Sequence, residues 1–98
     1  MTDFLQKRLA PSPDAAESAV GDETVLLHLK SGTYFGLDAM GTRIWAMLKQ
    51  GLAPADICAR IAADHDVPLA TVEADARRFL GELKDNDIVV EAGEETGG

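Results

Sequence analysis

The sequence is poor in the residue types on which several protein classes depend. Its single cysteine, Cys58, excludes an intramolecular disulfide and any metal site built from several cysteines. No stretch approaches the roughly 18 uninterrupted apolar residues of a membrane span. The residues that follow Met1 lack the apolar run of a secretory signal. We therefore expect a cytoplasmic protein that does not enter a membrane. We also expect Cys58 to be a small buried thiol.

Basic residues are also scarce. The 98 residues include nine Lys and Arg against seventeen Asp and Glu, which gives a formal net charge of −8. Because nucleic-acid binding depends on neutralising phosphates with cationic side chains, this balance argues against a DNA or RNA partner.

The sequence contains no recognisable set of side chains that would form a catalytic or metal-binding site. The two histidines, His28 and His65, lie far apart in the sequence, and no cysteine or carboxylate is spaced as a metal partner. Asp64 and Asp66 flank His65, but three consecutive side chains point in different directions. No serine lies in a nucleophile motif, and no glycine series forms a phosphate loop. We expect neither catalysis nor a metal or cofactor.

The most informative stretch runs from Thr24 to Asp38 and predicts a β-hairpin. Apolar and polar residues alternate before Ser31 and Gly32, and glycine there suits a turn with positive φ. A two-residue loop would scatter apolar residues over both faces, so a three-residue loop with Gly32 as the left-handed bulge residue is favoured. That register leaves His28 and Tyr34 on the outer face. It gathers on the inner face Val25, Leu27, Leu29, Phe35 and Leu37.

The flanking segments complete a small α+β domain. Residues 1–13 predict a loosely held N-terminal arm in which Phe4, Leu5 and Leu9 could pack on the domain or on a second copy. A first strand is expected from Asp14 to Val20, joined to the hairpin by a turn at Gly21. Asp38 is the expected N-cap of a first helix that ends near Gln50, with Gly51 after it.

Two further helices and a short strand follow. Pro54 suits the first position of a second helix, which ends around residues 64–66. From Leu69, apolar residues at helical spacing predict a third helix, and Ile88 to Val90 is β-prone. The acidic, glycine-rich residues 91–98 predict a disordered tail. The fold class is α+β and winged helix-turn-helix-like, a three-stranded antiparallel sheet followed by three helices, over residues 14–90.

The second strand of the hairpin, Thr33 to Leu37, is the predicted functional feature. It contains no Pro, Lys or Glu to discourage pairing with another strand. If the third helix packs beside it, an extended peptide could add to this edge and place side chains in the groove. Gly36 indicates close backbone approach, or else a bulge or a packing need. Tyr34 is a contact residue or a solvated aromatic, and Asp75 a ligand contact or a solvated acid.

These segments resemble the PqqD-like family, the recognition element for the leaders of ribosomally made, modified peptides. The resemblance rests on Val25 to Asp38, Gly41 to Trp45, Ala74 to Leu83 and Ile88 to Val90, and covers about 14–90. It is most similar to stand-alone members that work with lasso-peptide machinery. One departure is Pro68, at a position where many members have a capping Asp before the third helix.

The resemblance implies a peptide chaperone without catalytic activity. A precursor leader would bind as an added strand, and the protein would present it to a processing enzyme, either a leader peptidase or a radical-SAM maturase. Trp45 would belong to the core. The implied peptide-binding residues are Thr33, Tyr34, Phe35, Gly36 and Leu37 on the edge, with Val72, Asp75, Ala76 and Phe79 on the helix side of the groove.

Two alternatives use the same elements. A winged-helix transcription regulator would need a basic third helix, whereas Arg77 and Arg78 lie among Glu73, Asp75 and Glu82. A homodimer could form if two copies paired through the Thr33 to Leu37 edge.

Overall fold

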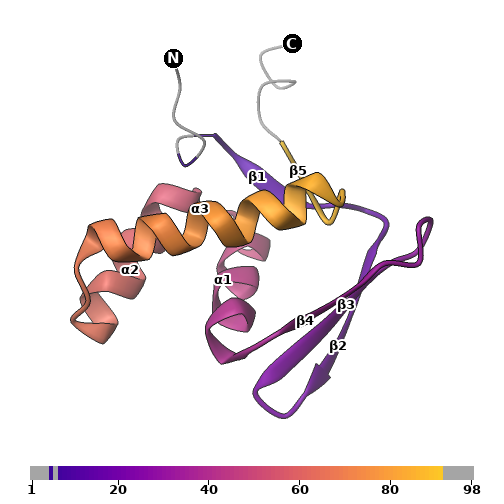
Figure 1. The fold of residues 1–98 in the computed structure, drawn as a ribbon, viewed down its shortest axis with the longest axis horizontal. Helices are drawn as coiled ribbons and strands as arrows, with labels where there is room; N and C mark the ends of the chain where they lie inside the picture. The colour runs from indigo at the N-terminus through magenta and orange to yellow at the C-terminus, as the bar shows by residue number, and fades with distance from the viewer. Residues whose placement is uncertain (1–4, 6, 92–98) are drawn as a thin grey trace.

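A three-stranded antiparallel sheet lies at one end of the molecule, and three helices pack beside it (Figure 1). The computed structural model describes Leu5 and residues 7–91. The sheet has the order β2-β3-β4, and a second sheet of two strands pairs β1 with β5. The elements in chain order are β1 (Leu9–Pro11), β2 (Ala15–Val20), β3 (Glu23–His28), β4 (Tyr34–Leu37), α1 (Ala39–Lys49), α2 (Pro54–His65), α3 (Leu69–Asp85) and β5 (Val89–Glu91). This is the predicted α+β class.

The register of the β3–β4 hairpin differs from the prediction. Leu26 lies opposite Phe35 and Thr24 opposite Leu37, one residue away from the predicted pairing of Leu27 with Phe35. A one-residue slip turns every side chain of a strand to the other face. Leu26 and His28 are therefore buried, and Leu29 is 62% exposed. The predicted inner positions of Val25, Leu27 and Leu29, and the outer position of His28, were wrong.

The length of the turn explains the one-residue difference between the predicted and the observed register. The loop between His28 and Thr33 has four residues instead of three, closed by the Gly32 amide donating to the His28 carbonyl at 2.8 Å. Gly32 has a φ of +75°, so its predicted left-handed conformation is confirmed. The His28 Nδ1 atom accepts from the amides of Lys30 and Ser31 at 3.3 and 3.2 Å. A polar ring with local backbone partners can be buried, which alternation of polar and apolar residues does not reveal.

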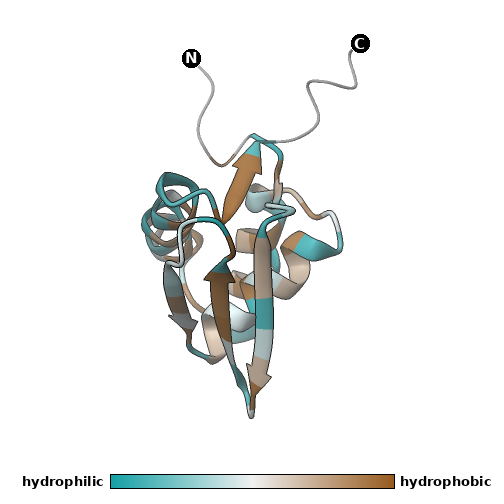
Figure 2. Ribbon diagram, turned by 90° about the vertical axis from the view of Figure 1, so that its right-hand side faces the viewer, coloured by the Kyte–Doolittle hydropathy of each residue, from teal (hydrophilic) through white to brown (hydrophobic). Residues whose placement is uncertain are grey.

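The outer face of the sheet is apolar at its centre. Figure 2 looks onto this face with the helices behind it, and hydrophobic residues run along β3, the middle strand. Val25 and Leu27 are half-buried there, and Tyr34 on β4 is 69% exposed. The predicted outward position of Tyr34 and inward position of Leu37 are confirmed.

The helix boundaries follow the predicted signals. The Asp38 carboxylate accepts from the Gly41 amide at 2.8 Å and caps α1. Gly51 after α1 has a φ of +94°, and Pro54 is the first residue of α2. Helix α3 begins at Leu69 after Pro68, which provides no side-chain cap. Cys58 is fully buried in the core, and burial raises the pKa of its thiol.

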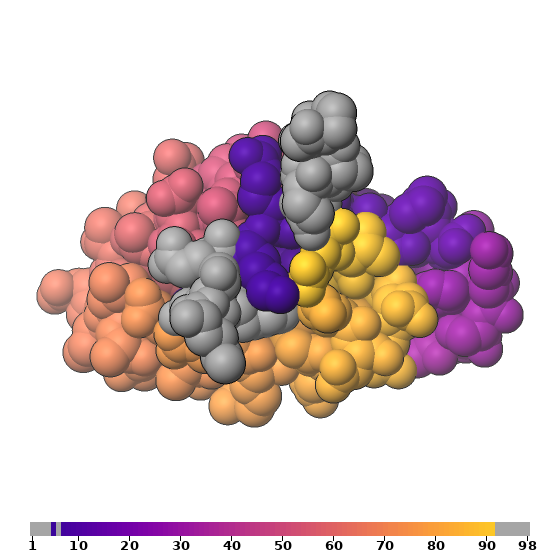
Figure 3. Space-filling view, turned by 90° about the horizontal axis from the view of Figure 1, so that it is seen from above, coloured from indigo at the N-terminus to yellow at the C-terminus, as the bar shows by residue number. Residues whose placement is uncertain are grey.

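The N-terminal segment is more ordered than the predicted loose arm. Leu5 and Leu9 are buried in the core, and Leu9 to Pro11 form β1. Strand β1 pairs with β5, so Leu9 lies opposite Glu91, and the two strands run side by side in Figure 3. The predicted β-prone run at the end of the domain therefore forms a strand, β5, which pairs with the N-terminal segment. Phe4, and the predicted acidic tail beyond Glu91, lie outside the described residues.

Strand β2 is tied to α1 through one carboxylate. Glu17 accepts from Trp45 Nε1 at 2.9 Å and from Lys49 Nζ at 2.8 Å. Trp45 is 2% exposed, which confirms its predicted core position. These bonds link β2 to α1, the helix that follows directly after β4. Across Leu5 and residues 7–91, no helix has the length and apolarity needed to cross a membrane.

Candidate functional site

Strand β4 forms one edge of the three-stranded sheet. The His28 amide donates to the Thr33 carbonyl at 2.9 Å, which makes His28 and Thr33 a hydrogen-bonded pair. Hydrogen-bonded and non-hydrogen-bonded pairs alternate along an antiparallel ladder. Phe35 and Leu37 therefore turn their backbone groups toward β3, whereas Tyr34 and Gly36 turn theirs away from it. In the described part of the chain no strand pairs with β4 on that side.

The open edge thus offers a short, regular set of hydrogen-bonding groups. Tyr34 and Gly36 each present one N–H and one C=O, in the spacing that an added strand would match. Each such bond contributes about 0.5–1.5 kcal/mol net. Four bonds give roughly 2–6 kcal/mol, which is comparable to or less than the cost of association. A peptide bound here needs side-chain contacts as well.

Gly36 is not required by the packing of the chain itself. It pairs with Val25 without a bulge, and a Cβ built on it would meet nothing within 4 Å. Of the explanations open from the sequence, a bulge and an internal packing need are both excluded. Close approach of another backbone to this edge, the remaining explanation, stays a prediction.

A hollow of about 200 Å³ opens where β4 leads into α1. Gly41 forms its floor: a Cβ there would lie 3.3 Å from both the Phe79 ring and the Leu37 side chain. The first two turns of α1 and one face of α3 make the walls. The lining residues are Asp38, Met40, Gly41, Ile44, Val72, Asp75, Ala76, Arg78 and Phe79.

The hollow combines apolar walls with a charged rim. Met40 is an exposed large apolar side chain, and Phe79 is half-buried, so both have surface to cover. Asp75 and Arg78 form an exposed ion pair at 3.4 Å, with side chains 65% and 74% exposed. Exposed pairs of this kind contribute little to stability, so either residue can exchange its partner for a ligand group at small cost.

The structure brings together all four residues predicted on the helix side. Val72, Asp75, Ala76 and Phe79 line one hollow at the end of the β4 edge. Of the five predicted edge residues, Tyr34 and Gly36 face the open side. Thr33 closes the turn, and Phe35 and Leu37 point inward to the core.

Sequence reasoning missed the contribution of α1 to the hollow. Asp38, Met40, Gly41 and Ile44 line it together with Arg78 of α3. Gly41 carried the available signal, because a glycine in the first turn of a helix sacrifices helix propensity and indicates a close contact. Spacing alone could not show that the contact is with Phe79, 38 residues later.

The residues of this site fall within a match to a known family. The sequence profile of the PqqD family, described as coenzyme PQQ synthesis protein D, matches residues 23–89, from the start of β3 to β5. The chain belongs to the PqqD family. The match includes the β4 edge, the hollow and all of α1, α2 and α3.

Two solved structures are similar to this chain. This PqqD-family chain is similar to the protein in "TbiB1 in Complex with the TbiA(beta) Leader Peptide", with 41% identity, a TM-score of 0.79, and coverage of 87% of this chain and 99% of that one. It shares its fold with the protein in "Lasso peptide synthetase B1 complexed with the leader peptide", at 24% identity and a TM-score of 0.77, covering 85% and 98%. A search of curated proteins finds no match.

Proposed function

We propose that this PqqD-family chain binds the leader of a ribosomally made precursor peptide and presents it to a processing enzyme. The observation that carries the proposal is the open β4 edge, with free backbone groups at Tyr34 and Gly36, followed by a hollow with apolar walls and a charged rim. The similar TbiB1 chain was solved in complex with a leader peptide. Because precursors are made by ribosomes, we place this step in the cytoplasm.

The leader pairs with β4 as a fourth strand. Its backbone bonds with Tyr34 and Gly36 set its register, and alternate side chains lie on the two faces of the enlarged sheet. A side chain that reaches the hollow packs on Phe79 and Met40. Burying one large apolar side chain there contributes about 1.5–3 kcal/mol. That contribution, added to the backbone bonds, offsets the cost of association and gives the site its selectivity.

The protein supplies binding and orientation, and the processing enzyme supplies the chemistry. Within Leu5 and residues 7–91 no three His, Cys, Asp or Glu residues are grouped as metal ligands. The enzyme is a leader peptidase or a radical-SAM maturase. The leader is held along one edge of the sheet, and the rest of the precursor is left for the enzyme to act on.

A titration of ¹⁵N-labelled protein tests this proposal. The probe is the leader of the precursor encoded beside this chain, with the TbiA(beta) leader as a comparison. We expect saturable shifts at Tyr34 and Gly36 and at the hollow residues Gly41, Ala76 and Phe79. Shifts limited to the chain termini, or no binding by either leader, would contradict the proposal.

Self-association through the same edge would compete with the leader. Sedimentation velocity with and without the leader distinguishes the two uses of β4. If two copies pair through β4, adding the leader converts the dimer into a 1:1 complex of protein and peptide.

A further inference from the structure

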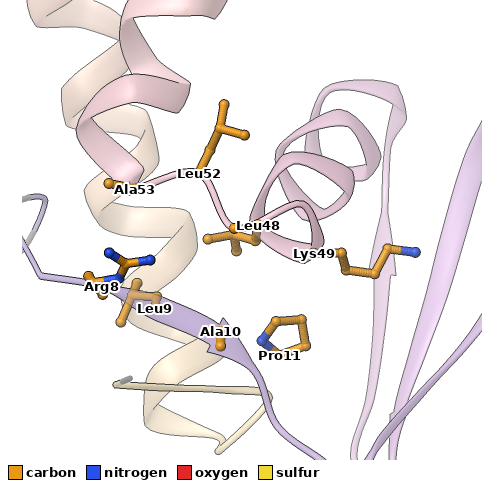
Figure 4. A pocket seen from close by; sticks show the side chains of 9 residues that line it. Arg8, Leu9, Ala10, Pro11, Leu48, Lys49, Leu52 and Ala53 are labelled. Atoms are coloured by element: carbon orange, nitrogen blue, oxygen red, sulfur yellow. The ribbon is translucent and has the colours of Figure 1, made fainter. Parts of the chain in front are cut away.

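A second hollow, of about 180 Å³, lies at the other end of α1 (Figure 4). Strand β1 forms one wall, and the connection between α1 and α2 forms the other. Its apolar lining consists of Leu9, Ala10, Pro11, Leu48, Leu52 and Ala53. The leader site uses none of these residues.

The geometry of β1 determines what can enter. The Ser12 amide donates to the Ile88 carbonyl at 2.8 Å, so Ser12 and Ala10 turn their backbone groups toward β5. Pro11 then lies where a free edge would offer an N–H, and proline has none. Another strand therefore cannot pair regularly with this edge. A cavity of about 150 Å³ lined by apolar side chains holds benzene, so this hollow can accept one Leu, Met or Phe side chain.

Two cations, Lys49 and Arg8, stand at the rim of this hollow, and within the described residues only Lys49 has a partner. Lys49 is bonded to Glu17 at 2.8 Å. Arg8 is exposed, and within the described residues it makes neither an ion pair nor a side-chain hydrogen bond. On a chain with a net charge of −8, an unpaired guanidinium beside an apolar hollow is complementary to a carboxylate next to an apolar side chain.

The two hollows are separated by the length of α1. Helix α1 has 11 residues, which at 1.5 Å per residue corresponds to about 16 Å. Met40 and Gly41 line the leader site near its N-terminus, and Leu48 and Lys49 line the second hollow near its C-terminus. A side chain bound in the second hollow therefore occupies neither the first hollow nor the β4 edge.

We propose that this second hollow docks the processing enzyme, which inserts an apolar side chain and pairs an adjacent Asp or Glu with Arg8. The inference rests on the proposed function, because it assigns a surface to the enzyme that receives the leader. The proposal requires that the protein binds the enzyme and the leader simultaneously, at opposite ends of α1.

Two variants and a matched control test the docking site. Arg8→Glu reverses the charge at the rim, and Ala53→Leu fills the hollow. Arg60→Glu makes the same charge change on an exposed Arg of α2 that does not line the hollow. Biolayer interferometry with leader-loaded protein and the processing enzyme encoded beside it measures the Kd of docking. We expect Arg8→Glu to weaken docking about tenfold or more, Ala53→Leu to weaken it as well, and Arg60→Glu to leave it unchanged.

Leader affinity separates this proposal from the proposed function. Each folded variant should bind the leader with the wild-type Kd, because β4 and the first hollow are untouched. Unchanged docking in both Arg8→Glu and Ala53→Leu, with normal leader binding, would overturn the docking site alone. Equal weakening by Arg60→Glu would also overturn it, because the effect would then reflect net charge. Failure of the wild-type protein to bind the leader would instead overturn the proposed function.

Discussion

Two glycines in helices, Gly41 and Gly81, allow the effect of packing beside the hollow to be distinguished from the effect of helix propensity. A Cβ on Gly41 would lie 3.3 Å from the Phe79 ring, whereas one on Gly81 of α3 would meet nothing within 4 Å. We expect Gly81→Ala to stabilise the fold by about 0.5–1 kcal/mol and to leave leader affinity unchanged. Gly41→Ala should be less stabilising and should weaken leader binding, because the added methyl group crowds the Phe79 ring, which lines the hollow.

Urea unfolding and calorimetric titration of the two variants check this expectation. If Gly41→Ala bound the leader as tightly as Gly81→Ala does, the hollow beside Phe79 would not be part of the site.

The ionisation of Glu17 makes the stability of the fold depend on pH. The hydrogen bond from Lys49, and then that from Trp45, lowers the pKa of Glu17 below its ordinary value of 4.5. A carboxyl whose pKa is lower in the folded state stabilises the fold above pH 4.5, and this contribution is lost as the pH falls through the folded-state pKa. Lys49→Met should therefore raise the pKa of Glu17 toward 4.5.

The associated stability change is small. The Lys49 and Glu17 side chains are 44% and 40% exposed, so the pair contributes about 0–1 kcal/mol at neutral pH. The difference in unfolding free energy between wild type and Lys49→Met should shrink as the pH is lowered through the titration of Glu17. A ¹³C titration of the Glu17 carboxyl measures the shift, and an unchanged pKa in Lys49→Met would show that Lys49 is not its cause.

At the level of elements, the sequence predicted which segments form strands and helices better than it predicted how strands pair. Capping and turn residues such as Asp38, Gly51 and Pro54 act locally, so their effects can be read from neighbouring residues. The hairpin register instead depends on the burial of His28, whose ring bonds to the loop that it precedes. The alternation of polar and apolar residues wrongly predicted that His28 faces solvent, because this pattern does not show that the ring has backbone partners in the loop.

Strand β1 was missed because its partner is distant in sequence. Residues 9–11 contain Pro11 and only three paired positions, and they pair with β5 some 80 residues later. The hollow was hard to predict for the same reason, because it is lined by residues far apart in the sequence, such as Gly41 and Phe79. The sequence identified the α3 residues of the hollow through the family resemblance, but not the contribution of α1.

The packing of β1 leads to a prediction on stability. Leu9 is 4% exposed and belongs to the core. We expect Leu9→Ala to destabilise the fold by about 2–5 kcal/mol. If residues 1–13 were a loose arm, the variant would unfold like the wild type. Urea unfolding decides between the two, with Val20→Ala on β2 as the control, because Val20 is 59% exposed.

At the level of the whole molecule, charge and topology favour a peptide over a nucleic acid. Helix α3, which would read DNA in a winged-helix regulator, carries three cations against four anions, Glu73, Asp75, Glu82 and Asp85. The exposed edge of β4 and the adjoining hollow suit an extended chain with an apolar side chain.

One pair of variants tests strand addition most directly. Gly36→Pro removes the outward N–H and places a ring on the open edge, a position that an edge strand tolerates. Phe35 before it is already in a strand, as a residue preceding proline prefers. Gly36→Ala keeps the N–H and adds a methyl group that meets nothing within 4 Å. Circular dichroism should show both variants folded.

The deciding measurement is the Kd of each variant for the leader by isothermal titration calorimetry. Strand addition on β4 predicts that Gly36→Pro loses about tenfold or more in affinity, while Gly36→Ala stays within about twofold of the wild type. Wild-type affinity in a folded Gly36→Pro variant would contradict the account, because the leader would then not pair with β4.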